Sequence, residues 1–255
     1  MKRTWISLVL AGLVPACAGP GDGPGDEAVA GAIRRALPST SIDAIRPSPV
    51  PGLVEVVAGR NVLYASASGR YLVIGHIYDL QAARDLTAER KAELARIAWD
   101  RLPLDAAVRY GQGALKVAVF HDPDCPWCRR LHRELRAAGD IEVYQIMYPV
   151  PALHPAARGK AVAILCHGDP AEASDRAAAG HDLDAPPAGC AESATAAVDR
   201  AMAFGRAHGI QGTPTLVAPD GRVHNGYLPV PRLKAWLQAG RESSPTEPTT
   251  QGGRS

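Results

Sequence analysis

The spacing of apolar side chains divides the chain into two structured regions, and the first of them is small. Residues 28–37 carry apolar side chains at helical spacing and end before Pro38, which predicts a short helix. Three apolar runs of strand length follow at residues 53–57, 62–65 and 71–78, separated by glycine-containing turns, and they predict an antiparallel meander. Because a sheet of this size is marginally stable by itself, we expect this region to form a dimer.

The second region follows a charged segment. Residues 87–102 have only a sparse apolar face, as in a solvated linker helix, and Pro103 would end that helix. The elements predicted after Gly113 are residues 115–120, 129–138, 141–147, 156–165, 192–208, 215–218, 223–227 and 231–239. Their order is a strand–helix–strand half, a helical insertion and a strand–strand–helix half, which is the thioredoxin arrangement. The expected fold class is therefore α+β, with a small antiparallel N-terminal dimerisation domain, a linker helix and a C-terminal thioredoxin-like domain with a helical insertion.

The N-terminus has the composition of an export signal. Basic residues precede a short apolar run, which is too short to span a membrane stably, and small residues follow it. Two processing routes compete: cleavage at the small residues Ala16 and Ala18, or a bacterial lipobox in which Cys17 becomes the lipidated first residue. Pro15 fits the lipobox poorly, but the residues after Cys17 are rich in glycine and proline, as in the flexible spacer of a tethered domain. We therefore favour a lipid anchor at Cys17.

These patterns predict six segments along the chain. They are a signal peptide (1–17), a flexible spacer (18–27), an N-terminal dimerisation domain (28–86), a linker helix (87–112), a thioredoxin-like domain (113–241) and a tail (242–255). The tail is rich in Ser, Thr, Pro and Gly, and this composition predicts disorder.

Charge and histidine spacing exclude two classes of partner. The chain has 28 Lys and Arg against 26 Asp and Glu, a formal net charge of +2, and the charges are mixed along it. Basic residues do not cluster with interleaved aromatic residues, so nucleic acid is not an expected partner. The histidines have no spacing typical of a metal site. We expect no metal and no cofactor, and we expect the histidines to lie on the surface.

Cys125 and Cys128 carry the strongest chemical signal. They flank Pro126 and Trp127 at the junction between a predicted strand and a predicted helix. Such a junction places the first thiol at a helix N-terminus, where unpaired backbone N–H groups and the helix dipole stabilise a thiolate. The second thiol, one turn later, can attack a mixed disulfide formed by the first. The motif predicts a reversible dithiol/disulfide couple that acts on the cysteines of other proteins.

Cys166 and Cys190 form a second pair. In an oxidising compartment, an even remainder of cysteines suggests a structural disulfide. A crosslink around the loop between them would remove roughly 3 kcal/mol of unfolded-state entropy. The first half of this loop has little apolar periodicity, so we expect it to order poorly by itself. Two free buried thiols, or a zinc site built from both cysteine pairs, are the less favoured alternatives.

Together these features resemble the DsbC/DsbG family of bacterial periplasmic disulfide isomerases, over nearly the whole mature chain. Residues 42–53 and 69–80 are similar to the family's N-terminal dimerisation domain. The Cys-Pro-Trp-Cys-Arg-Arg-Leu-His run at 125–132 is similar to its active-site helix, and the Gly-Thr-Pro run at 212–214 is similar to its cis-proline loop. Cys166 and Cys190 match the additional disulfide of the DsbC branch. The chain is closest to DsbC in this respect.

The resemblance implies a role for each residue of the motif. Cys125 is the nucleophile and Cys128 is the resolving thiol. Pro126 and Trp127 complete the active-site loop. A cis peptide bond is implied before Pro214, since X–Pro is the only bond for which the cis form is cheap. In the same way Thr213 is implied to contact clients and to tune Cys125.

The chain departs from known patterns at two positions. Pro126-Trp127 stands where the isomerase branch usually has Gly-Tyr, and this dipeptide helps to set the redox potential, which therefore stays open. Val119 stands where thioredoxins carry a buried aspartate that serves proton transfer. A thioredoxin-like proton relay through residue 119 is therefore not expected.

The other residues around the motif allow two interpretations each. Asp122 and Asp124 flank it, and carboxylates close to a thiolate would raise its pKa. His132 lies one turn beyond Cys128 and would favour the thiolate when protonated, although a solvated histidine is the favoured interpretation. Trp127 either offers an apolar contact to clients or shields the sulfurs.

We predict a periplasmic thiol:disulfide isomerase/reductase that attacks non-native disulfides in exported proteins and rearranges or reduces them. By resemblance, it is a homodimer, its clients are misfolded exported proteins, and a membrane electron donor of the DsbD type keeps it reduced. One alternative is a dithiol oxidant, or a reductant of oxidised single cysteines. The other is a chaperone-type binding module in which the thiols are secondary.

Overall fold

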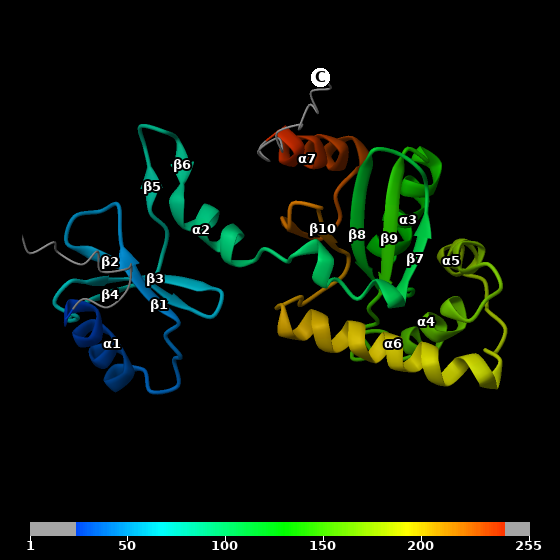
Figure 1. Cartoon of the computed structure of the whole chain (residues 1–255), viewed down its shortest axis with the longest axis horizontal. Helices are drawn as coiled ribbons and strands as arrows, with labels where there is room; N and C mark the ends of the chain where they lie inside the picture. Colours follow the sequence, from blue (N-terminus) through cyan, green and yellow to red (C-terminus); the bar gives the residue numbers. More distant parts are fainter. Residues whose placement is uncertain (1–23, 243–255) are drawn as a thin grey trace, which may run out of the picture. The chain divides into compact units, whose positions relative to one another are not determined.

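The chain forms two compact units that divide between Ala88 and Glu89 (Figure 1). A computed structural model describes residues 24–242. The predicted signal peptide, the lipidation site at Cys17 and the tail from residue 243 onward lie outside these residues. Within residues 24–242, no helix is both long and apolar enough to cross a membrane.

The N-terminal unit packs one helix against a four-stranded antiparallel sheet. Val29 and Ile33 lie on one face of the helix α1 (Pro24–Ala36) and are buried against Val56 and Ala65 of the sheet. In spatial order, the strands are β1 (Ala44–Pro47), β2 (Leu53–Ala58), β3 (Asn61–Ser66) and β4 (Leu72–Val73). The predicted helix and antiparallel meander are therefore confirmed in type.

Three details of the N-terminal unit differ from prediction. The helix α1 begins at Pro24, so the end of the predicted flexible spacer (18–27) is helical. An additional strand, β1, forms in the proline-rich segment, where Pro47 is tolerated because β1 lies at the edge of the sheet. The predicted third strand (71–78) is divided: its start is β4, and its last residue belongs to a separate two-stranded hairpin. That hairpin consists of β5 (Tyr78–Asp79) and β6 (Arg84–Asp85).

The predicted linker helix is too long. The helix α2 (Leu86–Leu94) ends well before Leu102. Beyond its end, Ile97 is almost fully buried in the second unit, and its N–H donates to the carbonyl oxygen of Gly221 at 2.9 Å. This tertiary contact holds the chain in a non-helical conformation that helix periodicity does not reveal. Two short 3-10 turns follow, at Trp99–Arg101 and Leu104–Ala106.

The second unit contains a five-stranded mixed sheet. In spatial order, its strands are β11 (Val223–Asn225), β10 (Thr215–Val217), β8 (Leu115–His121), β9 (Ile141–Met147) and β7 (Ala107–Tyr110). The strands β8 and β9 run parallel, and the other neighbouring strands are antiparallel. The strand β7 was not predicted, and it extends the sheet to residues before the expected boundary at 113. The chain then turns at Gly111, which has a positive φ. The turn requires glycine, because a Cβ atom there would collide with the carbonyl oxygen of Ile141.

Helices cover both faces of this sheet. They are α3 (Pro126–Ala138), α4 (Ala157–Leu165), α5 (Pro170–Ala178), α6 (Ala188–Ala207) and α7 (Val230–Glu242). Along β8, Val119 points into a core with Leu131 of α3, and Phe120 points into a second core with Ala201 of α6. The predicted thioredoxin-like order with a helical insertion is confirmed. The helix α7 reaches Glu242, the first residue of the predicted disordered tail (242–255).

Candidate active site

The first thiol of the motif lies at the start of α3. The strand β8 ends at His121, and a tight turn follows in which the N–H of Cys125 donates to the carbonyl oxygen of Asp122 at 3.2 Å. Cys125 is the N-cap residue of α3, with extended backbone, and Pro126 occupies the first turn, where a missing N–H costs nothing. Both Cys125 and Cys128 are free thiols. The strand–turn–helix placement predicted for the motif is therefore observed.

The two thiols have opposite acidities. The pKa of Cys125 is lowered from its ordinary value of 9.0 to about 5, although burial opposes this. The largest cause is the hydrogen bond from the Cys128 thiol. Smaller contributions come from the backbone N–H groups of Cys128 and Trp127 and from the side chain of Thr213. Burial, and then the hydrogen bond and the charge of Cys125, raise the pKa of Cys128 far above its ordinary value. At neutral pH, Cys125 is therefore a thiolate and Cys128 is a thiol that donates to it.

The loop around Pro214 lies directly beside Cys125. The Thr213–Pro214 peptide bond is cis, as predicted. The sulfur of Cys125 lies 3.4 Å from the carbonyl oxygen of Thr213. Next to this loop is a cavity of about 270 Å³, which is lined by the loop, by the start of β10 and by the end of β11: Gly209, Gln211, Gly212, Thr213, Pro214, Thr215, Asn225 and Gly226.

Trp127 is the exposed member of the motif. Its side chain is 54% exposed, yet its ring centroid lies 5.5 Å from that of Tyr227. The guanidinium of Arg130 lies 4.7 Å from the centre of the Tyr227 ring, and Tyr227 donates its hydroxyl to Glu134 at 2.7 Å. Trp127 is thus supported from one side and presents the rest of its ring to solvent next to the reactive thiol.

The two acidic residues before the motif are paired with other groups. The carboxylate of Asp122 is fully buried and accepts from the N–H of Val150 at 2.7 Å, and it lies 3.0 Å from His154 Nδ1. Asp124 pairs with Arg129 at 2.8 Å and with Lys160 at 2.6 Å. Their negative charges are therefore compensated locally, and the main causes of the low pKa of Cys125 are other groups.

The prediction that the histidines lie on the surface is wrong for His121 and His132. Only 2% of His132 is exposed, and His121 is also buried. His132 falls on the inner face of α3 because Cys128, Leu131 and Leu135 mark that face at helical spacing. The same helical spacing in the sequence would have predicted that His132 is buried. Its ring nitrogens contact Tyr110, Gln145 and Asp175.

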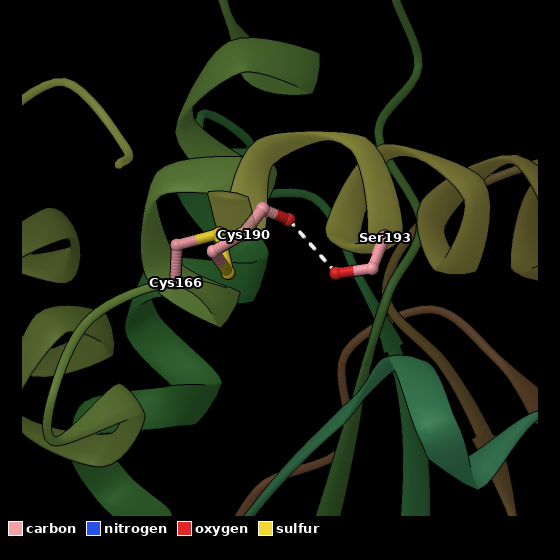
Figure 2. The surroundings of a disulfide bond; sticks show 3 residues. All are labelled: Cys166, Cys190 and Ser193. Atoms are coloured by element: carbon pink, nitrogen blue, oxygen red, sulfur yellow. Dashed lines mark hydrogen bonds between the residues drawn. A yellow bond between two sulfur atoms is a disulfide. The ribbon is translucent and has the colours of Figure 1, made fainter. Parts of the chain in front are cut away.

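Cys166 and Cys190 are joined in a disulfide, as predicted. The bond connects the C-terminal end of α4 to the first turn of α6, where Ser193 Oγ donates to the Cys190 carbonyl oxygen at 2.9 Å (Figure 2). The loop between the two cysteines is more ordered than expected, because it contains the helix α5. Asp169 caps this helix by accepting from the N–H groups of the first turn. Among residues 24–242, no group of His, Cys, Asp and Glu side chains is arranged to hold a metal ion.

Comparisons with known proteins match both units. The family described as "Disulfide bond isomerase protein N-terminal domain" matches residues 21–88, and the family described as "Thioredoxin-like domain" matches residues 103–241. A probable thiol:disulfide interchange protein DsbC from Bordetella pertussis is 36% identical over 199 residues, which are 77% of this chain and 68% of that protein.

The chain belongs to the DsbC family of thiol:disulfide interchange proteins.

Two further proteins are similar to this chain. DsbC of Escherichia coli is 29% identical over 214 residues, which are 81% of this chain and 86% of that protein. A solved disulfide interchange protein from Neisseria gonorrhoeae is 37% identical, with a TM-score of 0.45, over 54% of this chain and 97% of its own. As a DsbC-like protein with a CxxC motif at Cys125 and Cys128, this chain is a thiol:disulfide interchange protein.

Proposed function

We propose that this protein is a periplasmic thiol:disulfide isomerase and reductase that acts on non-native disulfides of exported proteins. One observation carries the proposal: in a member of the DsbC family, Cys125 has a pKa of about 5 and accepts a hydrogen bond from the thiol of Cys128. A nucleophile that is ionised at neutral pH, next to a resolving thiol that is protonated, can both capture and release a client.

The reaction proceeds through a mixed disulfide. The Cys125 thiolate attacks one sulfur of a client disulfide, and the other client sulfur leaves as a thiolate. If that thiolate then attacks another client disulfide, and a client thiolate later displaces Cys125, the client is isomerised and the protein is unchanged. If Cys128 displaces the client instead, the client is reduced and a Cys125–Cys128 disulfide remains. A membrane electron donor of the DsbD type would then reduce this disulfide.

The loop at Thr213 and Pro214 is the proposed contact for the client chain. Proline has no N–H, and the Thr213 backbone, at the cis bond before it, lies close to Cys125. An extended client segment could pair with the Thr213 backbone there as an added strand. The cavity beside the loop and the exposed ring of Trp127 support this placement.

Dimerisation through the N-terminal unit is the proposed assembly. The match to the N-terminal domain of disulfide bond isomerases supports it. So does a group of large exposed apolar side chains on and around β4 and in the segment after it: Tyr71, Val73, Ile74, Tyr78 and Leu80. The strand β4 lies at the edge of its sheet and is only two residues long, so another copy of the chain could extend it. Periplasmic export with lipidation at Cys17 rests on the sequence of the N-terminus alone.

Refolding of a client with scrambled disulfides tests the function. Catalytic amounts of the reduced protein should restore the activity of a scrambled multi-disulfide enzyme, and Cys125→Ala should abolish this effect. A wild-type protein that oxidises reduced clients but leaves scrambled ones inactive would instead establish the dithiol oxidant. Suppression of client aggregation that survives replacement of both thiols, without any disulfide exchange, would establish the chaperone-type binding module.

The redox state in growing cells separates isomerase from oxidant independently. An isomerase needs a free Cys125 thiolate, so gel-shift alkylation should find the Cys125–Cys128 pair mostly reduced. A mostly oxidised pair would contradict the isomerase proposal and favour the oxidant.

A further inference from the structure

Cys128 must lose a proton before it can resolve a mixed disulfide, and its surroundings oppose this loss. Its side chain has no exposed surface, and burial is the largest cause of its raised pKa. The negative charge of Cys125 disappears once the mixed disulfide forms, but the burial remains. Val119, at the position where thioredoxins hold a carboxyl group, cannot accept a proton. The proton of Cys128 therefore needs another acceptor on this side of the sheet.

His132 lies at the same level of the sheet as Val119. The parallel register of β8 and β9 pairs Val119 with Gln145, and the Oε1 atom of Gln145 lies 2.7 Å from Nδ1 of His132. In the helix α3, His132 follows Cys128 by four residues, so both side chains lie on the same buried face. The histidine thus replaces, from the helix, the ionisable group that β8 lacks.

The contacts of His132 satisfy both of its protonation states. Nε2 lies 2.7 Å from Asp175 Oδ1, and Nδ1 lies 3.1 Å from the Tyr110 hydroxyl and 2.7 Å from Gln145 Oε1. In the neutral ring, Nε2–H donates to Asp175 and Nδ1 accepts from the Tyr110 hydroxyl. In the charged ring, Nδ1–H donates to Gln145. Both ring nitrogens therefore keep a hydrogen-bond partner in each protonation state.

The hydrogen-bonded chain also connects the interior to solvent. Burial, and in smaller part the charges of Asp175 and then Cys128, raise the pKa of Tyr110, whereas the charge of Arg136 lowers it, so the hydroxyl lies within the electrostatic reach of the buried thiol. At the other end, the side chain of Asp175 is 39% exposed and is held by Arg136 at 2.7 Å. A proton that reaches His132 can exchange with water at Asp175.

The groups that face His132 come from every element packed around it. They are Tyr110 on β7, His121 on β8, Cys128 and Arg136 on α3, Gln145 on β9 and Asp175 on α5. Burial lowers the pKa of His132, and the hydrogen bonds that its N–H groups donate to Asp175 and Gln145 oppose this. The ring of His121 lies 6.1 Å from that of His132, and burial lowers the pKa of His121 well below its ordinary value.

We propose that His132 accepts the proton of Cys128 during resolution, with the Tyr110 hydroxyl as the connecting group and Asp175 as the exit to solvent. The S–H bond of Cys128 breaks, and the proton passes to Nδ1. The Cys125–Cys128 disulfide forms as the bond between Cys125 and the client sulfur breaks, and this sulfur leaves as a thiolate. The client disulfide is reduced by two electrons, and the dithiol is oxidised by two. This inference rests on the resolving role proposed for Cys128.

The reaction of the full-length reduced protein with dithiobis(nitrobenzoate) separates the two steps. Attack by Cys125 releases one coloured thiolate, and resolution by Cys128 releases a second, slower one. In His132→Gln, we expect the second phase to slow by about 100-fold, a typical contribution of acid–base transfer, while the first phase keeps its wild-type rate. The pH profile should change as well. The wild-type second phase should level off at neutral pH, whereas in His132→Gln it should keep rising with pH, because Cys128 then ionises without assistance.

Two more variants protect this test against a merely structural explanation. Asp175→Asn keeps the shape of a partly exposed residue but removes the carboxylate that stabilises the charged ring of His132. It should slow the second phase by a smaller factor than His132→Gln does. It should also shift the pH midpoint of the second phase downward. His121→Gln is the matched control, a second buried histidine beside the first, and its second phase should be unchanged.

The outcomes separate the relay from the proposed function. Wild-type second phases in both His132→Gln and Asp175→Asn would overturn the relay, as would an equal slowing in His121→Gln. If the wild-type protein released colour in two phases but did not isomerise scrambled clients, only the isomerase proposal would be refuted. If the wild-type first phase were absent, the proposed attack by Cys125 and the relay would both be refuted.

Discussion

The pair Cys125 and Cys128 and the pair Cys166 and Cys190 lie in the same unit, yet only the second pair is joined. The first pair is local. Its nucleophile receives hydrogen bonds from a neighbouring thiol and from the start of α3, and these stabilise the reduced, ionised form. The second pair connects α4 to α6 across a sequence separation of 24, so its reduction would release a long segment of chain.

The difference shows that environment, and not residue type, decides what a cysteine pair does. Stabilising a thiolate makes a disulfide easier to reduce, because the reduced product is favoured. A disulfide that closes a long loop contributes more to stability, because its loss increases the conformational entropy of the unfolded chain more. Four changes would break or sharpen this contrast.

The largest effect is expected from the nucleophile. Cys125→Ser should eliminate disulfide exchange, because a serine hydroxyl is not ionised at neutral pH, whereas the double substitution Cys166→Ala/Cys190→Ala should retain the exchange rate of the folded protein. Reduction of a small disulfide by a thiol, with the protein as catalyst, measures both. Comparable losses in the two variants would mean that the pairs are not functionally distinct.

The structural pair should dominate stability instead. Cys166→Ala/Cys190→Ala should lower the free energy of unfolding by roughly 3 kcal/mol, the entropy of closing a loop of this size. Urea denaturation of this variant and of the wild type measures the difference. Cys125→Ala/Cys128→Ala provides the comparison, since it removes no crosslink from the reduced protein. An equal loss in both variants would contradict the assigned roles.

The pH dependence should distinguish the pairs next. Alkylation of Cys125 by iodoacetamide should be nearly constant at neutral pH and decline with a midpoint of about pH 5, whereas the disulfide between Cys166 and Cys190 does not titrate. Because the folded pKa of Cys125 is below its unfolded value, the thiolate stabilises the reduced protein fully above about pH 9. This contribution declines as the pH falls and is absent below about pH 5. A midpoint near pH 9 would show that the helix terminus does not stabilise the thiolate.

The smallest effect is expected from Thr213. Its side-chain hydrogen bond is one of the minor causes of the low pKa of Cys125. Thr213→Val, which has nearly the same shape, should therefore raise the midpoint of the alkylation profile slightly. Thr213→Ser retains the hydroxyl and should leave the midpoint in place. An unchanged midpoint in Thr213→Val would assign the tuning of Cys125 to α3 and Cys128 alone.

The reactive motif could be predicted because its parts are close in sequence. A strand, two thiols and a helix follow one another within residues 115–138, and they determine where the nucleophile lies, whatever surrounds them. The disulfide between Cys166 and Cys190 followed from counting cysteines. Helix α5 between them was missed because small side chains such as Ala173 and Ala177 are buried there without forming a strong apolar pattern.

The linker was misjudged for a related reason. The polar composition of residues 87–102 is compatible with a helix, but a single buried side chain, Ile97, and its backbone hydrogen bond to Gly221 decide where the helix ends. Such a contact involves residues more than a hundred positions apart, and apolar periodicity reports only neighbours.

The sequence by itself determined the two-unit plan, the thioredoxin-like order of elements and the identity of the nucleophile, because each depends on short-range patterns of apolar side chains, turns and thiols. The family resemblance implied that Thr213 lies near Cys125, and the tertiary structure shows the contact; only the tertiary structure joined His132 to residues from β7, β9 and α5. Acidity depends on burial and on partners brought together by folding, so the chemistry of the buried thiol could be derived only from the folded chain.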